Sequence, residues 1–420
     1  MKKISLVFEH EIEYYLFHPI LKILEKENYE IYILTSQRTK KLIEADFLKN
    51  NFIYYDNDLS IGLKILNGLH RIFTILFTPH NFSDQYKRMV IKNFIHRKNI
   101  WSFFYRLSFI TPKSKNINKL IFNFFKNFTP NIFATQKVLV PTLNSYAFLL
   151  NNKDLEVYTV MESWDHAMKI PNSYLSKKVF LWNNDLQNDW KTYQKDNYTY
   201  NIYPLKLRFA KNNKFEKRKV KDKVVYAVAF TSLYSNPVAE TMEKKVIKDL
   251  CEVTKLLNLD FLIKPRPISS AHEFKPFLDS YDHVDLGYYN PPEKNPSFYS
   301  LNDDYNKKRF NEIKDALFTI NCFTTFALDS ALIGIPVLQL DLRNIYPDTS
   351  FFYDNHHIKK YFISSSNILK IENNFKVEFV NYFKSGNDAH HKFRLELENW
   401  VSNNDSIESS IKKMLKEIYS

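Results

Sequence analysis

Two adjacent threonines followed by an aspartate are the clearest chemical signal in the sequence. They lie in the stretch DALFTINCFTTFALDSALIGIPVLQLDLRN, at positions 315–344. An apolar run ends near Asn321, and Thr324 and Thr325 follow in the first turn of a predicted helix. Hydroxyl groups and the N–H groups of a helix N-terminus together favour phosphate binding. Asp329 lies about one turn further on, where its carboxylate can accept hydrogen bonds from a sugar or glycerol hydroxyl. Alternatively, Thr324 is an ordinary N-cap and Asp329 a surface residue.

A second candidate for phosphate binding is a pair of cations at the end of another apolar run. The run Phe261 to Lys264 continues with Pro265 and Arg266. Cations at the carboxyl end of a parallel strand are well placed to meet a diphosphate. A guanidinium group does not release its proton, which argues against a general-acid role for Arg266.

The segment Glu9-His10-Glu11 directly follows the first predicted strand, Ile4 to Phe8. This order places His10 at the carboxyl edge of a sheet, where α/β domains bind ligands. Imidazole titrates near neutral pH and the flanking carboxylates raise its basicity, so His10 suits deprotonation of an acceptor hydroxyl. Alternatively, His10 only caps or packs against the strand end.

Ser163, Trp164 and Asp165 follow another predicted strand and are candidate site residues. Alternatively, the tryptophan fills the core and the aspartate caps a helix. No metal site is expected, because Asp303 and Asp304 are adjacent on a proline-rich loop and the two cysteines have no zinc-ligand spacing.

Strand-like runs alternate with helical periodicity along the whole chain, which is typical of α/β folds with parallel sheets. We expect two Rossmann-like α/β domains, an N-terminal domain over residues 1–205 and a C-terminal domain over residues 224–392. Residues 206–223 carry nine Lys and Arg against two acidic residues and are predicted to be a basic linker or, alternatively, an anion-binding patch. Residues 393–420 are amphipathic and are expected to form a C-terminal helical segment that packs back.

Composition excludes several kinds of site. The chain has 420 residues but only 5 glycines, against about 29 at the usual share of about 7%. This shortage argues against glycine-rich phosphate loops and dinucleotide fingerprints. The formal net charge is +13, which suits phosphorylated partners. Alternatively, a protein encoded in an AT-rich genome would have much of this charge without any such partner.

The region between Ile61 and Phe128 is basic and rich in aromatic residues. Helices of this composition can lie on an anionic membrane, or they can be core helices with basic outer faces. No apolar run is long enough for a signal-peptide core or a membrane span. We therefore expect a cytoplasmic protein, with peripheral contact at the inner face of the cytoplasmic membrane as one alternative.

Three segments resemble those of GT-B fold glycosyltransferases, and the closest group is that of the CDP-glycerol glycerophosphotransferase-like and bacterial surface-polysaccharide transferases. The hydroxyl pair Thr324-Thr325, the later Asp329 and the Gly334-x-Pro336 turn match in type, although the acid that precedes the hydroxyl pair in that group is absent. Lys264-Pro265-Arg266-Pro267 resembles the Lys-x-His-Pro segment with Arg in place of His, and Ser163-Trp164-Asp165 resembles the Ser-Trp-Asp segment.

The resemblance implies a metal-independent glycosyltransferase that uses a nucleotide-activated sugar and a bacterial capsule, lipopolysaccharide or related surface-glycan acceptor, which includes lipid-linked primers. In such an enzyme the two domains face a cleft, with the N-terminal domain binding the acceptor and the C-terminal domain binding the nucleotide donor. The donor would be bound by Lys264, Arg266, Thr324, Thr325 and Asp329, and His10 between Glu9 and Glu11 would be the base. Ser163, Trp164 and Asp165 would lie on the acceptor side of the cleft. A CDP-glycerol or CDP-ribitol polyol-phosphate transferase and a sialyl- or Kdo-type CMP-sugar transferase are alternatives. A non-enzymatic protein that binds nucleic acid is a second alternative, supported only by the basic charge, and we expect no nucleic-acid partner and no cofactor.

Overall fold

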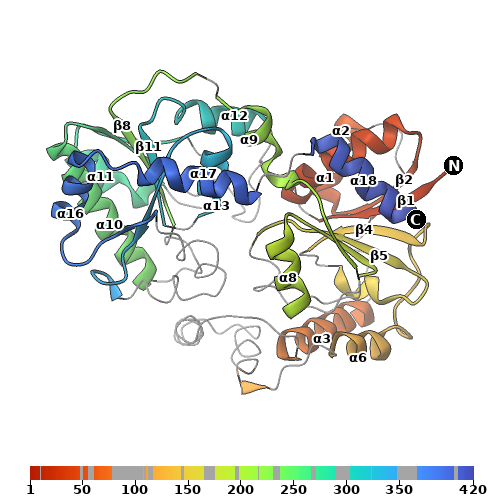
Figure 1. Cartoon of the computed structure of the whole chain (residues 1–420). Helices are drawn as coiled ribbons and strands as arrows, with labels where there is room; N and C mark the ends of the chain where they lie inside the picture. Colours follow the sequence, from red (N-terminus) through yellow and green to blue (C-terminus); the bar gives the residue numbers. More distant parts are fainter. Residues whose placement is uncertain are drawn as a thin grey trace. The chain divides into compact units, whose positions relative to one another are not determined.

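The computed structural model describes residues 1–9, 11–47, 51–54, 61–77, 107, 110–111, 117–142, 146–164, 176–193, 198–215, 217–229, 237–265, 271–288, 303–322, 324–347, 367–401 and 405–420. The described residues form two compact units (Figure 1). Unit 1 contains those up to Lys206 and those from Asp405 onward, and unit 2 contains those from Leu207 to Val401.

The described part of unit 1 is built on a seven-stranded parallel sheet with the order β3-β2-β1-β4-β5-β6-β7. The strands are β1 (Lys3–Val7), β2 (Glu30–Thr35), β3 (Asn51–Tyr54), β4 (Lys137–Pro141), β5 (Glu156–Val160), β6 (Lys178–Leu181) and β7 (Tyr198–Asn201). Its helices are α1 (Glu11–Lys26), α2 (Gln37–Asp46), α3 (Ile61–Phe77), α6 (Ile117–Phe125), η1 (Ala147–Asn151), α8 (Asn184–Tyr193) and α18 (Ile407–Tyr419).

Alternate residues of β1 belong to different cores, because successive side chains of a strand point to opposite faces of the sheet. Ile4 and Leu6 pack with α1 and α18 in one cluster, and Val7 packs with α6 and η1 in another. Burial on both faces explains why the central strands read as continuous apolar runs.

The described part of unit 2 has a six-stranded sheet with the order β10-β9-β8-β11-β12-β13, again parallel throughout. The strands are β8 (Lys223–Ala227), β9 (Asp260–Lys264), β10 (Val284–Leu286), β11 (Phe318–Asn321), β12 (Val337–Asp341) and β13 (Leu369–Lys370). The helices, after the turn η2 (Leu205–Leu207) at the unit boundary, are α9 (Arg208–Asn212), α10 (Pro237–Leu256), η3 (Ala271–Glu273), α11 (Lys275–Ser280), α12 (Asp303–Asn311), α13 (Thr325–Leu332), α16 (Phe375–Lys384) and α17 (Ala389–Val401).

Each sheet has a point at which the order of its strands reverses. In unit 1 this point lies between β1 and β4, and in unit 2 it lies between β8 and β11. Open α/β sheets bind ligands outside the carboxyl ends of their strands at such a point. Glu9 follows β1 and Thr324 follows β11, so each lies at the switch point of its own sheet. The predicted α/β class with two Rossmann-like domains is confirmed.

The basic stretch 206–223 differs from the solvated linker that its composition suggests. Part of it forms α9, and the Arg218 guanidinium donates hydrogen bonds to the carbonyl oxygens of Lys314 (2.8 Å), Gly334 (3.2 Å) and Ala316. Its partners lie about a hundred residues further along the chain, which explains why local composition does not reveal them. From Leu207 onward, the described residues of this stretch therefore belong to unit 2.

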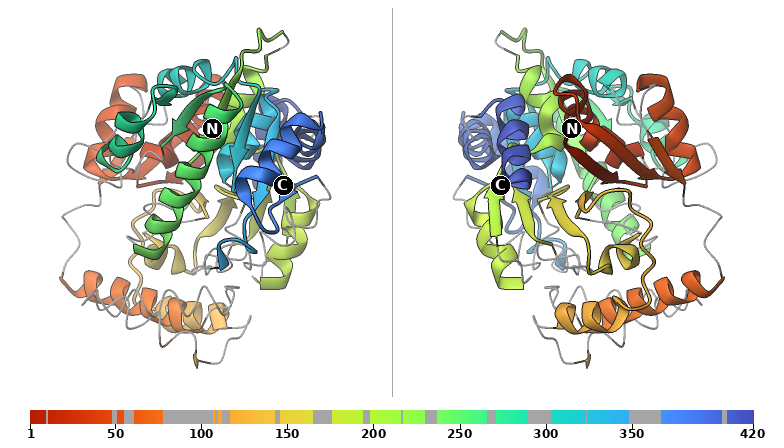
Figure 2. Two further views of the ribbon diagram at one scale, coloured as in Figure 1. Left: turned by 90° about the vertical axis from the view of Figure 1, so that its left-hand side faces the viewer. Right: turned by 90° about the vertical axis from the view of Figure 1, so that its right-hand side faces the viewer.

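The C-terminal stretch contains two helices that belong to different units. α17 lies in unit 2, and α18 lies in unit 1, where Ile411, Met414, Leu415 and Ile418 join the core around α1. The two ends of the chain meet there (Figure 2), and the Tyr419 hydroxyl donates to the Lys3 carbonyl oxygen at 2.7 Å. The expected C-terminal helix that packs back is confirmed.

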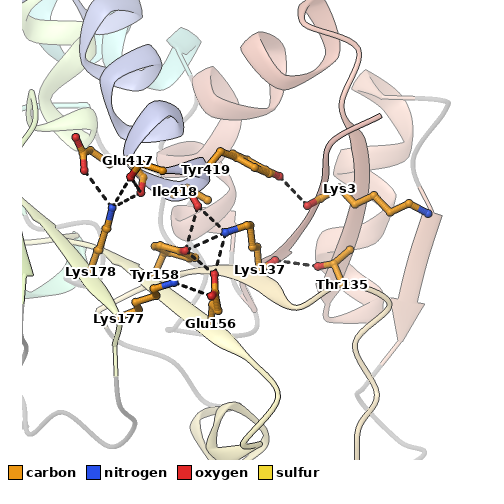
Figure 3. A network of polar contacts seen from close by, with 11 residues as sticks. Lys3, Thr135, Lys137, Glu156, Tyr158, Lys177, Lys178, Glu417, Ile418 and Tyr419 are labelled. Atoms are coloured by element: carbon orange, nitrogen blue, oxygen red, sulfur yellow. Dashed lines mark hydrogen bonds and ion pairs between the residues drawn. The ribbon is translucent and has the colours of Figure 1, made fainter.

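Figure 3 shows how the last turn of α18 is fixed to the sheet of unit 1. The Lys137 ammonium and the Tyr158 hydroxyl donate to the Ile418 carbonyl oxygen at 2.7 and 3.0 Å. The carbonyl groups at a helix C-terminus have no partner within the helix, so such donors stabilise it. Lys137 also pairs with Glu156 at 2.8 Å. Burial would raise the pKa of Glu156, but hydrogen bonds from Lys137 and Lys177 outweigh it and lower the pKa to about 2.

Candidate functional site

Lys264, the last residue of β9, is buried at the carboxyl edge of the sheet of unit 2. Its side chain is 3% exposed, forms an ion pair with Glu312 and donates to the Tyr288 carbonyl oxygen. Glu312 also accepts a hydrogen bond from the Tyr288 backbone N–H at 2.5 Å. Burial lowers the pKa of Lys264 to about 8, although Glu312 opposes the shift. The Lys264 ammonium therefore binds Glu312 and the Tyr288 carbonyl oxygen in this structure.

Gly287 allows Lys264 to lie where it does. A Cβ atom at this position would be 3.1 Å from Lys264 Cδ and 3.3 Å from the Ile263 carbonyl oxygen. The Gly287 backbone N–H donates to that same oxygen at 2.8 Å. The close approach of two backbone segments over a buried lysine accounts for one of the few glycines.

Thr324 is the N-cap residue of α13, with φ −90° and ψ 157°, but its side chain does not cap the helix. Its hydroxyl donates instead to the Asn321 side-chain carbonyl oxygen at 2.9 Å. By contrast, Ser36, Asn374 and Ser406 each accept a backbone N–H at the start of α2, α16 and α18. The first turn of α13 thus lacks the side-chain acceptor that a threonine N-cap ordinarily provides. This geometry leaves the helix terminus suited to an anionic acceptor.

Asp329 lies one turn into α13 and is paired rather than exposed. Its Oδ2 accepts from Arg309 Nη2 at 2.6 Å, and the residue is 9% exposed. The Arg309 guanidinium lies 5.4 Å from the centroid of the Phe326 ring in the first turn of α13. Its Nε is buried and has no hydrogen-bond partner among the described residues. Arg309 therefore lies beside both the carboxylate and the start of α13.

Arg309 and Glu312 are site residues that sequence reasoning missed. They lie in and just after α12, which begins at Asp303, whereas the sequence suggested a loop at Asp303 and Asp304. The basic run at positions 307–309 was the available signal. Arg309 also contributes to the lowered pKa of Lys264, so the two cations interact. The structure thus brings together two cations and two carboxylates: Lys264, Arg309, Glu312 and Asp329.

Not every predicted donor residue can be placed. Arg266 lies outside the described residues. Thr325 begins α13 directly after Thr324, so the hydroxyl pair does lie at a helix N-terminus, as the sequence predicts. Gly334 has φ +89°, and its N–H donates to the Ala331 carbonyl oxygen at 3.1 Å. This left-handed conformation ends the helix as expected and favours glycine.

At the carboxyl edge of the sheet of unit 1, the loop after β1 is held firmly at Glu9. The Glu9 carbonyl oxygen accepts from the hydroxyls of Ser36 (2.9 Å) and Thr39 (2.7 Å), and its N–H donates to a Glu13 carboxylate oxygen at 2.5 Å. His10 lies outside the described residues. Glu11 begins α1, and its side chain also lies outside them.

The predicted acceptor residues Ser163 and Trp164 follow β5 at the same edge. They are 7% and 3% exposed, so Trp164 is buried, as its core-packing alternative predicts. The Glu162 backbone N–H donates to the Thr142 hydroxyl at 3.2 Å, which links the ends of β5 and β4. Asp165 lies outside the described residues.

Metal and membrane-spanning features are absent from the part of the chain that the structure describes. No group of three or more His, Cys, Asp or Glu side chains there is placed to hold a metal ion. No described helix is both long and apolar enough to cross a bilayer. The buried Cys251 thiol has its pKa raised to about 12 by burial, so it is unsuited to act as a thiolate nucleophile.

Neither a family model nor a curated protein matches the sequence. Among solved structures, the chain is similar to UDP-GlcNAc 2-epimerase from Methanocaldococcus jannaschii, with a TM-score of 0.52, 12% identity and all of both chains covered. It is also similar to S. aureus MnaA solved with UDP, with a TM-score of 0.53, 11% identity, and 100% of this chain and 96% of that chain covered. At such identity the similarity concerns the fold alone, and the chain has the GT-B architecture of two Rossmann-like α/β domains.

Proposed function

We propose that the protein is a GT-B glycosyltransferase that binds a nucleotide-activated sugar at the carboxyl edge of the sheet of unit 2. The observation that carries the proposal is the start of α13 at the switch point, where the Thr324 hydroxyl is turned toward Asn321 and does not cap the helix. A helix N-terminus at this position is where α/β folds hold phosphate groups.

In this proposal the donor diphosphate contacts the first turn of α13 together with Thr324, Thr325 and Arg266. The helix terminus and the Arg266 guanidinium stabilise the negative charge that develops on the leaving nucleotide. Asp329, fixed by Arg309, accepts hydrogen bonds from a donor hydroxyl. Lys264 is a positioning residue, because its ammonium holds Glu312 and the Tyr288 carbonyl oxygen.

We assign the base to His10, with Glu9 and Glu11 raising its basicity. The imidazole takes the proton of an acceptor hydroxyl, the acceptor oxygen forms a bond to the anomeric carbon, and the bond from that carbon to the nucleotide phosphate breaks. The assignment is supported by the anchoring of Glu9 at the switch point of unit 1. The proposed acceptor is a bacterial surface glycan or its lipid-linked primer, with Ser163, Trp164 and Asp165 on the acceptor side.

A uridine nucleotide is the first ligand to test, because the similar structures include the M. jannaschii epimerase in complex with UDP-GlcNAc and UDP. Calorimetry of the full chain with UDP, CDP, CMP and GDP compares the wild type with Thr324→Val/Thr325→Val. Each hydrogen bond to a charged group contributes about 1.5–3 kcal/mol, so we expect affinity to fall at least tenfold. Thr192→Val, on the exposed face of α8, is the matched control.

Turnover of labelled sugar nucleotide tests the base separately. His10→Ala should lower turnover by about 10²–10⁴-fold while nucleotide affinity is retained. Wild-type affinity in the double threonine variant and wild-type turnover in His10→Ala would together reject the assignment. Formation of an epimerised sugar nucleotide without an acceptor would instead indicate an epimerase, and transfer of a polyol phosphate would indicate the alternative transferase.

A further inference from the structure

α3 and α6 lie side by side in unit 1 (Figures 1 and 2) and expose a continuous apolar surface. On α3 the exposed large apolar residues recur at every fourth position, which places them along one side of the helix. They are Ile61 (79% exposed), Ile65 (58%), Leu69 (42%) and Phe73 (40%). The opposite side of the helix contains the buried His70 and Thr74.

α6 and the turn that follows it continue this surface. Leu120, Phe124 and Phe128 are 60%, 59% and 54% exposed, again at every fourth position. The rings of Phe73 and Phe124 stack with centroids 6.3 Å apart, which joins the two rows. We call these seven side chains the α3–α6 apolar face.

Such clustering is unusual for a water-exposed surface. Seven of the fifteen large apolar side chains exposed among the described residues belong to this face. Single exposed apolar residues are normal, whereas contiguous patches mark sites of interaction. Burial of one such side chain contributes about 1.5–3 kcal/mol, so a partner that covers the face gains substantially.

The charged side chains of α3 and α6 all have one sign. The sequences of α3, IGLKILNGLHRIFTILF, and α6, INKLIFNFF, contain no Asp or Glu. Lys64, Lys119 and Lys126 lie on these elements or just after them, and among the described residues no carboxylate lies within ion-pair distance of these three lysines. The partner should therefore combine an apolar layer with negative charge.

We infer that the α3–α6 apolar face docks onto the surface of an anionic lipid bilayer. The apolar side chains enter the boundary between headgroups and acyl chains, and the lysines extend to the headgroup phosphates. A symmetric pairing of two copies through this face would bring lysines of like charge together, which disfavours a second copy as the occupant. The inference concerns unit 1 and does not depend on the nucleotide site.

Vesicle co-sedimentation of the full chain tests the inference. One set of vesicles contains phosphatidylcholine alone, and the other contains phosphatidylcholine and phosphatidylglycerol in a three-to-one ratio. We expect binding to the anionic vesicles that weakens as salt screens the lysines, and much weaker binding to the neutral ones. Each lysine near an anionic surface is worth about fivefold in affinity.

Two variants separate the apolar and the charged contributions. Ile65→Ser/Phe124→Ser removes exposed apolar side chains, and its matched control is Leu256→Ser/Val377→Ser, at positions 71% and 55% exposed in unit 2. Lys64→Gln/Lys119→Gln/Lys126→Gln removes the cations, and its control of equal charge is Lys153→Gln/Lys217→Gln/Lys275→Gln. Each test variant should lose at least tenfold in vesicle affinity, while the controls bind as the wild type does.

Equal binding to neutral and anionic vesicles, or no binding to either, would overturn the inference. So would anionic-vesicle binding that both test variants retain. A dimer that Ile65→Ser/Phe124→Ser abolishes, in a chain that ignores vesicles, would assign the face to a second copy. If the apolar variant does not fold, judged by circular dichroism, the lysine variant alone decides.

Discussion

Replacement of Glu312 by Gln removes the charge that balances the buried Lys264 ammonium. Loss of one partner from a buried pair costs about 3–5 kcal/mol of unfolding free energy. The Glu312 side chain is 21% exposed, and the Tyr288 carbonyl oxygen still accepts a hydrogen bond from the ammonium in the variant. We therefore expect a loss of unfolding free energy at the lower end of this range, about 3 kcal/mol. The loss of unfolding free energy has an upper limit, because a buried lysine releases its proton when keeping the charge costs more. Deprotonation of an ordinary lysine at pH 7 costs about 5 kcal/mol.

The pH dependence of this loss has a definite sign. Burial already lowers the pKa of Lys264 to about 8, and removal of Glu312 lowers it further. Between the folded and the unfolded pKa the unfolded chain binds more protons, so stability rises with pH in that window. Above about pH 9 Lys264 is neutral in both folded proteins, and their stabilities then rise in parallel. The difference between Glu312→Gln and the wild type should therefore shrink as the pH rises from 7 to about 9 and stay constant above that.

Urea unfolding of the full chain, followed by circular dichroism, measures the effect. Lys264→Met/Glu312→Leu should recover most of the loss, because an apolar pair of similar volume removes the unbalanced charge. Asp388→Asn, which removes one partner of the exposed pair with Lys392, is the control and should change stability much less. A Glu312→Gln protein as stable as the wild type, at neutral and at alkaline pH, would refute the reasoning.

Two further predictions concern other parts of the fold. Lys137→Met removes a donor from the Ile418 carbonyl oxygen and one of the two lysine partners of Glu156, so the end of α18 should become more sensitive to limited proteolysis. Unchanged cleavage rates would contradict this. His390 lies 2.5 Å from the Tyr382 hydroxyl, and burial lowers the pKa of His390 to about 4. The stabilising contribution of neutral His390 is therefore complete above about pH 6.5 and is lost as the pH falls toward 4. His390→Phe should consequently lose less unfolding free energy over that range than the wild type. A pH dependence identical to that of the wild type would be inconsistent with this account.

The order of strands and helices was largely predictable, because buried parallel strands leave continuous apolar runs. The run Ile4 to Phe8 forms most of β1, and the run Phe261 to Lys264 forms most of β9. The elements that we did not predict lack such an apolar run. β10 and β13 span three and two residues, and α12 has the polar sequence DDYNKKRFN without apolar periodicity.

The position of the candidate site in the fold could be predicted from the sequence, but the ion pairs that its charged residues form could not. Strand ends and helix starts follow from local sequence, so Thr324 and Lys264 could be assigned to one edge of a sheet. Their partners come from distant segments: Glu312 lies 48 positions from Lys264, and Arg309 lies 20 positions from Asp329. Only the folded sheet brings these charges together, which explains why the sequence suggested free cations where the structure has ion pairs.

Hydrogen–deuterium exchange of the full chain with and without UDP tests the central claim most directly. If the donor binds at the start of α13, exchange should slow in peptides that cover β11 and α13 (residues 318–332) and the end of β9, and Thr324→Val/Thr325→Val should abolish the effect. Unchanged exchange across these peptides at UDP concentrations that saturate binding elsewhere in the chain would contradict the account.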